Sequence, residues 1–320
     1  MSVQYTAALI GLGNIAWRFD ASNAGPIART HLGAFQRNER VKVICGYSPV
    51  ARDRNEFEQA TGIPACSTLE ELWGAKPDIV SICSPSETHY EHALTGLTQH
   101  VPLVWLEKPP TLTLHDLDLL IHQQDLQHGR TRVLVNYMRR YSLVYKALGD
   151  VYRQHILGKP LGMQILYSRG LETNGSHFLD VAFSMAGDTG VPEVHVSDVE
   201  RTKDEPTFLL RFPDGLVASF CGHSAGYHIN DVILTCADGR ASVLSGGLET
   251  RLERRVPNDE FAGFFRLRQV QDDLLASGSD DAFSAALTDL IGAHEHGIQP
   301  RSNLTTARQT QAVIDQIRNT

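Results

Sequence analysis

The sequence predicts an α/β protein, in which a doubly wound parallel sheet is followed by an α+β domain with a large, mainly antiparallel open sheet. In the first half, short apolar runs alternate with helical stretches, the order that builds a parallel sheet. In the second half, short strands follow one another across turns such as PDG and ADG. We place the boundary near residue 130, with a dinucleotide-binding domain over 1–130 and a substrate and oligomerisation domain over 131–320.

The apolar runs give the expected strands of the first half, which are 6–10, 41–47, 77–83, 101–106 and 132–138. Helices are expected from Ser67 or Thr68, each with a glutamate at the capping-box spacing, and over about 88–99 and 113–128. The second half predicts a helix over 142–155, several strands and two late helices over 281–293 and 304–318. Within TFLLRF, Phe208, Leu210 and Phe212 alternate with residues of the opposite face.

Composition narrows the class of protein. The 320 residues carry a formal net charge of −8, which argues against nucleic acid or an anionic membrane as a partner. The 5 cysteines are scattered and form no C-x-x-C pair, as expected in a reducing compartment. No signal peptide or membrane-spanning run is recognisable, so we expect a cytoplasmic protein.

The first chemical motif is GLGNIA, residues 11–16, between an expected strand and a helix. Gly11 and Gly13 would permit a tight turn and close approach of a pyrophosphate, which the N–H groups of Asn14, Ile15 and Ala16 would face at the helix start. Ala16 replaces the third glycine of the dinucleotide-binding fingerprint. The alternative for such a short motif is a purely structural glycine turn.

The helix after this turn is interrupted by turn-forming residues, among them Asp20, Ser22, Asn23 and Pro26. We expect one helical turn, a loop over roughly 20–27 and a helix that resumes near Ala28. This loop is either a tolerated insertion or a segment that leans over the active site.

Two further motifs follow strand ends, where ligands bind in open α/β sheets. Ser84, Pro85 and His89 follow the third strand, and Glu107 and Lys108 follow the fourth. We expect these five residues to contact the cofactor, although His89 fits a surface or capping role equally well. Lys108 lies where burial would lower the pKa of its ammonium group, and the prolines after it restrict the backbone.

The motifs GLGNIA, CSPSETH, EKPPTL and NGSHFLD, in this order, resemble the Gfo/Idh/MocA oxidoreductases. The resemblance covers nearly the whole chain and implies a Rossmann domain, a C-terminal domain with an open sheet, and NAD(H)- or NADP(H)-dependent chemistry on sugars, inositols or nucleotide sugars. It further implies that Lys108 is the catalytic acid/base, that the Lys108–Pro109 bond is cis, and that His177 assists at the reacting oxygen.

Other expected substrate contacts are Arg139, in NYMRRY, and Asn174, although a solvated or salt-bridged arginine pair is at least as compatible with that motif. Many relatives have an aspartate four residues before the histidine, where this chain has Thr173, so inositol is disfavoured as the substrate. Asp180 is at most a neighbour of the site. We expect no metal site.

Cofactor choice depends on the end of the second strand. The acidic residue typical of NAD-specific domains falls near Tyr47, and the first carboxylate, Asp53, belongs to the next helix. Ser48 could donate to a 2′-phosphate, and Arg52 or Arg54 could neutralise it. The sequence therefore slightly favours NADP over NAD.

Together these observations predict an NAD(P)-dependent oxidoreductase that acts on a carbohydrate-like alcohol or ketone and forms a homodimer or homotetramer through its second sheet. The alternative is a ligand sensor of the same fold that binds NAD(P) without turnover. An intact E-K-P motif and His177 argue against the sensor, because a sensor need not keep an acid/base lysine.

Overall fold

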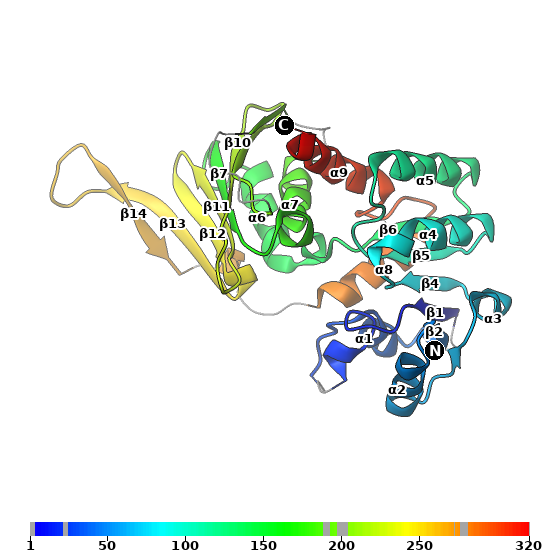
Figure 1. Ribbon diagram of the computed structural model, residues 1–320. Helices are drawn as coiled ribbons and strands as arrows, with labels where there is room; N and C mark the ends of the chain where they lie inside the picture. Colours follow the sequence, from blue (N-terminus) through cyan, green and yellow to red (C-terminus); the bar gives the residue numbers. More distant parts are fainter. Residues whose placement is uncertain are drawn as a thin grey trace. The chain divides into compact units, whose positions relative to one another are not determined.

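The structure is a computed structural model that describes residues 4–21, 25–187, 193–196, 204–271, 273–275 and 281–319 (Figure 1). Ser22 and Asn23, expected in the loop after the glycine turn, lie outside these residues. Two compact units are present: unit 1 comprises Met1–Met138 and Asp281–Arg308, and unit 2 comprises Arg139–Asp280 and Gln309–Thr320. No helix of the described residues is long and apolar enough to cross a membrane.

Unit 1 is built on a six-stranded parallel sheet in the order β3-β2-β1-β4-β5-β6, which confirms the doubly wound fold. The strands are β1 (Tyr5–Ile10), β2 (Val41–Tyr47), β3 (Ala65–Cys66), β4 (Ile79–Ile82), β5 (Leu103–Leu106) and β6 (Arg132–Val135). Only the two-residue β3 was not predicted. Because the chain runs from β3 across β1 to β4, the order reverses beside β1, where dinucleotides bind in such sheets.

The helices of unit 1 are α1 (His31–Arg37), α2 (Ala51–Thr61), α3 (Leu69–Gly74), α4 (His89–Thr98) and α5 (Leu114–Leu126). Thr68 caps α3, and its side chain and that of Glu71 form the expected capping box. Ala8, Val80 and Val104 lie in one apolar core with Leu97 of α4 and Leu117 of α5.

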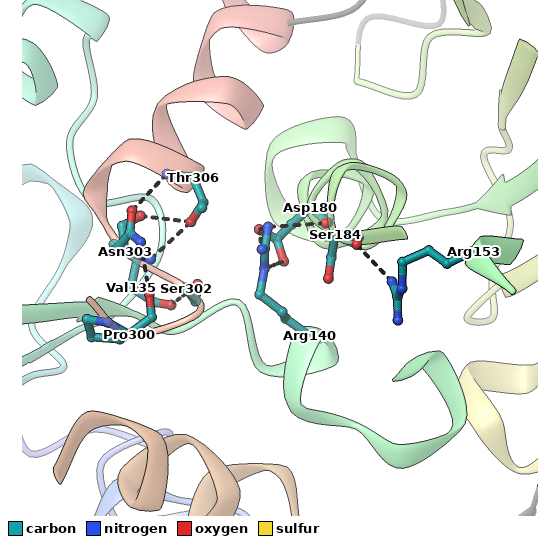
Figure 2. Close-up of polar contacts among 9 residues, drawn as sticks. All are labelled: Val135, Arg140, Arg153, Asp180, Ser184, Pro300, Ser302, Asn303 and Thr306. Atoms are coloured by element: carbon teal, nitrogen blue, oxygen red, sulfur yellow. Dashed lines mark hydrogen bonds and ion pairs between the residues drawn. The ribbon is translucent and has the colours of Figure 1, made fainter. Parts of the chain in front are cut away.

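Residues 281–308 belong to unit 1, although we expected them in the second domain. Helix α8 (Ala282–Glu295) packs against α1, β5 and β6. Ser302 then accepts a hydrogen bond from Val135 N–H at 3.1 Å and donates one to Val135 O at 2.6 Å (Figure 2). Asn303 and Thr306 bond reciprocally at 3.0 Å at the start of α9 (Leu304–Asn319). Tertiary hydrogen bonds that local pattern does not encode therefore return this segment to the first sheet.

Unit 2 contains an eight-stranded sheet in the order β14-β13-β12-β11-β7-β10-β9-β8, in which β7 and β10 are parallel and the other pairs antiparallel. Its strands are β7 (Pro160–Tyr167), β8 (Glu193–Val196), β9 (Phe208–Arg211), β10 (Val217–Gly222), β11 (Asn230–Cys236), β12 (Gly239–Leu244), β13 (Glu249–Pro257) and β14 (Phe265–Val270). This mixed, mainly antiparallel sheet confirms the predicted second architecture.

Helices α6 (Leu143–Arg153) and α7 (Ser176–Ala186) cover one face of this sheet (Figure 1). Phe208, Leu210 and Phe212 face the core and are at most 2% exposed, whereas Leu209 on the other face is 37% exposed. The alternation in TFLLRF is therefore confirmed, and the structure shows that Phe208, Leu210 and Phe212 are on the buried face.

Candidate active site

The glycine turn closes against the neighbouring strand end. Gly11 has a φ of +90°, and a Cβ there would come within 2.5 Å of Ser84 N. Its N–H donates to Tyr47 O at 2.8 Å. A Cβ at Gly13, in contrast, would meet no atom of the described residues within 4 Å. Gly11 is thus needed for packing, and Gly13 leaves the open space that close approach of a pyrophosphate requires.

A short 3-10 helix (Arg18–Asp20) and α1 follow the glycine turn as separate elements, and backbone hydrogen bonds join α1 to the turn. Trp17 N–H donates to Gly13 O at 3.3 Å and closes one turn. The start of α1 is bonded to this turn, since His31 N–H donates to Ile15 O at 3.2 Å and Leu32 N–H donates to Ala16 O at 2.9 Å. Helix α1 resumes at His31, not near Ala28 as we expected, because Thr30 is extended and caps it.

Side-chain hydrogen bonds hold the described part of the segment between the glycine turn and α1. Asp20 Oδ2 accepts hydrogen bonds from Arg29 N–H at 2.9 Å and from Thr30 Oγ1 at 2.7 Å. Arg37 donates to the carbonyls of Gly25 at 2.6 Å and Pro26 at 3.1 Å. These contacts set where α1 restarts, and hence where the side chain of His31 lies.

His89, on the first turn of α4, joins the two strand ends that carry expected site residues. Its ring is 1% exposed, with Nε2 2.8 Å from Ser84 O and Nδ1 2.7 Å from Pro109 O. Both ring nitrogens therefore face backbone carbonyls. Ser84 is half-buried and Pro85 exposed beside it.

Glu107 is enclosed by hydrogen-bond donors. Its Oε1 lies 2.9 Å from His31 Nε2 and 2.5 Å from Asn136 Nδ2, and its Oε2 accepts from Lys108 N–H at 3.2 Å. Burial alone would raise the pKa of this carboxyl. The contact and charge of His31, the bond from Asn136 and the charge of Lys108 outweigh burial, so the pKa is lowered. Glu107 is therefore a carboxylate that is largely, though not fully, shielded, with a side chain that is 13% exposed.

Lys108 is half-buried, and the Lys108–Pro109 bond is cis, as the resemblance implies. His31 and Asn136, which hold the adjacent glutamate, were not among the expected site residues. Asn136 directly follows a strand, a position that could have pointed to it. Nothing in the local sequence marks His31.

The end of β2 is more crowded with charge than expected. Ser48 is buried, and its Oγ lies 3.3 Å from Asp53 Oδ2, so a carboxylate does reach this strand end from α2. Arg18 donates to Asp53 at 2.7 Å and was also missed. Arg52 is turned outward, with a side chain that is 84% exposed. Arg54 donates to Ser48 O at 2.8 Å.

In unit 2, the expected substrate residues lie around the start of α7. His177 is on its first turn and is 8% exposed. Asn174 Oδ1 accepts from Arg139 at 3.0 Å, while its Nδ2 donates to Ser168 O at 2.9 Å and Asn230 Oδ1 at 2.6 Å. The Arg139 guanidinium lies 4.6 Å from the centroid of the Phe178 ring, and burial lowers its pKa.

Arg140, the other arginine of NYMRRY, is paired inside unit 2. Its Nη2 and Nε donate to the two carboxylate oxygens of Asp180 at 2.7 and 3.0 Å (Figure 2). Both side chains are almost fully buried, at 3% and 0% exposed. This pair is the salt-bridged alternative that the sequence left open.

Part of the chain matches the model of a known protein family. Residues 6–137 match the model of the Gfo/Idh/MocA family, described as "Oxidoreductase family, NAD-binding Rossmann fold". Over these residues the chain matches the oxidoreductase family, which confirms the resemblance for this part of the chain.

Individual relatives are more distant. Inositol 2-dehydrogenase of Mycolicibacterium gilvum is 33% identical over 112 residues, which cover 34% of this chain and 32% of the relative. This chain thus aligns with about a third of that relative's length.

Among solved structures, a dehydrogenase from Chromobacterium violaceum superposes with a TM-score of 0.80 at 17% identity, over 100% of this chain and 95% of that one. The WlbA dehydrogenase of Bordetella pertussis, in complex with NADH and UDP-GlcNAcA, gives a TM-score of 0.76 at 14% identity, over 100% and 96%. These similarities establish the fold.

Proposed function

We propose that this protein is an NAD(P)-dependent oxidoreductase that transfers a hydride between nicotinamide and a carbohydrate alcohol or ketone. One observation supports it above the others: the glycine turn and the lysine loop form one continuous edge of the sheet. Gly11 packs on Ser84, and the ring of His89 lies between Ser84 O and Pro109 O, beside Lys108. A cofactor held at the glycine turn would extend along the edge that carries the lysine.

The residues at this edge suit a dinucleotide. Gly11, Gly13, Asn14, Ile15 and Ala16 would hold the pyrophosphate, with open space at Gly13 for its approach. Ser84, Pro85 and the Glu107–Lys108 loop would line the nicotinamide end. When bound, the nicotinamide ring supplies or accepts the hydride.

Lys108 would move the proton that accompanies the hydride. In oxidation the neutral amine takes the hydroxyl proton as the carbonyl forms, and in reduction the ammonium returns it to the nascent alkoxide. His177 would donate a hydrogen bond to the same oxygen or relay the proton. Arg139 and Asn174 would orient the substrate from unit 2, although Asn174 already makes three hydrogen bonds there.

For the substrate we propose a sugar or nucleotide sugar. The named relatives act on inositol or were solved with UDP-GlcNAcA, all polyhydroxylated compounds. Thr173 occupies the position of an aspartate in many inositol dehydrogenases of this family, so a substrate other than free inositol is favoured.

The decisive experiment replaces Lys108 by alanine. We expect Lys108→Ala to bind NADH or NADPH as the wild type does, by fluorescence titration, but to lose turnover by about 10²–10⁴, the usual scale of general acid–base catalysis. Turnover is followed at 340 nm against a panel of sugars and nucleotide sugars. Activity within a few-fold of wild type would refute the role of Lys108, and bound cofactor with no turnover on any compound would favour the sensor.

For assembly we propose a homodimer or homotetramer through the open face of the second sheet. Leu209 on this face is 37% exposed, more apolar surface than a free sheet face favours. Light scattering at micromolar concentration tests this, and a monomer would contradict it.

A further inference from the structure

A chain of buried polar side chains runs behind the lysine loop of unit 1. It begins at Cys83 Sγ, 3.4 Å from Ser81 Oγ, which lies 2.6 Å from His31 Nδ1. His31 Nε2 is 2.9 Å from Glu107 Oε1. These side chains come from β4 and its end, from α1 and from the end of β5, so only the folded sheet brings them together.

His31 is enclosed on its remaining sides by apolar rings. It is 0% exposed, its ring centroid lies 4.1 Å from that of Trp105 and 5.5 Å from that of Phe283. A buried histidine held this way has a fixed orientation. Its two ring nitrogens face two specific oxygens, Ser81 Oγ and Glu107 Oε1.

The hydrogen-bond roles follow from Glu107. An ionised carboxylate accepts only, so His31 Nε2 must carry the proton and donate it. In the neutral imidazole, Ser81 Oγ then donates to Nδ1 and can accept from the Cys83 thiol. In the imidazolium, Nδ1 donates to Ser81. In both forms the contact with Glu107 is a charge-assisted hydrogen bond.

We propose that His31 is a positioning residue for the acid/base lysine: through Nε2–H it holds the Glu107 carboxylate in place, and Glu107 in turn holds the backbone of Lys108. The last link is the bond from Lys108 N–H to Glu107 Oε2 at 3.2 Å. The segment between the glycine turn and α1 would thereby help to place His31, since the contacts of Asp20 and Thr30 set where α1 begins. This proposal rests on the proposed function of Lys108.

The groups that face Glu107 make its charge depend on His31. They are His31 from α1, Asn136 after β6, the Cys83 thiol after β4 and Lys108 itself. Without the His31 donor, burial would favour the protonated carboxyl, which presents less negative charge to Lys108. Less negative charge favours the neutral amine of Lys108, which is the base in oxidation, so the acid limb of the kcat profile for oxidation would move to lower pH.

Three variants test this: His31→Leu removes the donor, His31→Gln keeps an N–H that can reach the carboxylate, and His92→Leu is the control. His92 is another buried histidine of unit 1, on α4. We expect His31→Leu to lower kcat by about 10–100-fold, as loss of an orienting outer hydrogen bond does at other sites. The substrate KM and the cofactor Kd should change little, and the acid limb of the kcat profile for oxidation should shift to lower pH. His31→Gln should recover most of the rate, and His92→Leu should match the wild type.

Two outcomes would overturn the proposal. One is His31→Leu with a kcat within about twofold of wild type. The other is His31→Gln no faster than His31→Leu at equal thermal stability, which would reduce His31 to a packing role.

A spectroscopic measurement separates this proposal from the proposed function. The 14 histidines are labelled with nitrogen-15, and the His31 signal is assigned by its loss in His31→Gln. A protonated Nε2 whose shift changes in Glu107→Gln supports the hydrogen bond, and an unprotonated Nε2 refutes it. Full activity in Lys108→Ala would refute the proposed function of Lys108. The nitrogen-15 measurement would still show whether His31 donates a hydrogen bond to Glu107.

Discussion

Each unit buries one carboxylate beside a basic residue, and the two arrangements differ. In unit 2, Asp180 is bound by both donor edges of the Arg140 guanidinium, and both side chains are shielded from solvent (Figure 2). In unit 1, Glu107 is bound by an imidazole, an amide and a backbone N–H, and its neighbouring cation is Lys108.

The difference separates a structural charge from one available to chemistry. Arg140 cannot lose its proton, so the Asp180 pair remains neutral as a whole at any ordinary pH. Glu107 is held by groups that fix its position, and the nearby Lys108 can change its protonation state. We therefore expect changes at Asp180 to alter stability first, and changes at Glu107 to alter the chemistry of Lys108.

The largest expected effect is loss of the buried pair. Arg140→Met should destabilise the protein by about 3–5 kcal/mol, because it leaves an uncompensated buried carboxylate. Chemical denaturation measures this. The matched control is Arg153→Met, which removes the exposed Arg153–Asp150 pair at 2.8 Å and should cost under about 1 kcal/mol. Equal losses in the two variants would show that the pair at Asp180 is not special.

The double variant sharpens the comparison. Arg140→Met with Asp180→Leu removes both charges, and stability should recover markedly relative to Arg140→Met alone. If the double variant is no more stable than Arg140→Met, the cost comes from lost packing.

The next effect is the pH dependence of Glu107→Gln. The folded pKa of Glu107 is lowered, so its contribution is present above the unfolded value of about 4.3 and is lost as pH falls through the folded pKa. The variant should therefore be less stable by about 1–3 kcal/mol at pH 7, and the gap should shrink below about pH 4. Unfolding curves between pH 3 and 7 measure the gap. The exposed Glu39→Gln should change stability by under about 0.5 kcal/mol, and a pH-independent gap for Glu107 would contradict the lowered pKa.

The smallest effect concerns cofactor choice at the end of β2. Asp53 contacts Ser48 and would repel a 2′-phosphate, while Arg18 partly neutralises it. Asp53→Asn should tighten NADPH relative to NADH by roughly tenfold, or about 1.4 kcal/mol. Glu56→Gln removes the other carboxylate bound by Arg18, at 2.9 Å, and should change the ratio less. Fluorescence titration with NADH and NADPH measures the ratio of their dissociation constants in each variant. Wild-type NADH binding more than tenfold tighter than NADPH would contradict the slight preference for NADP that the sequence predicts. An unchanged ratio in Asp53→Asn would remove Asp53 from cofactor choice.

Much of the architecture was predictable because it depends on local pattern. Alternating apolar runs and helices specified the parallel sheet, and the period of two in TFLLRF assigned Phe208 and Leu209 to opposite faces. The capping box at Thr68 and Glu71 located the start of α3. Strand ends also marked the edge that carries Ser84 and Lys108, since ligands bind beyond the carboxyl ends of parallel strands.

By itself, therefore, the sequence determined the two kinds of sheet, the glycine turn and the order of the motifs that carry the family resemblance. The tertiary structure decided which distant side chains meet: His31 with Ser81 and Glu107, and Arg18 with Asp53. It also returned 281–308 to unit 1 through Ser302 and Val135. Periodicity reports which face of an element is buried, but a hydrogen bond between residues far apart in the chain depends on how the elements pack, and no local pattern encodes that.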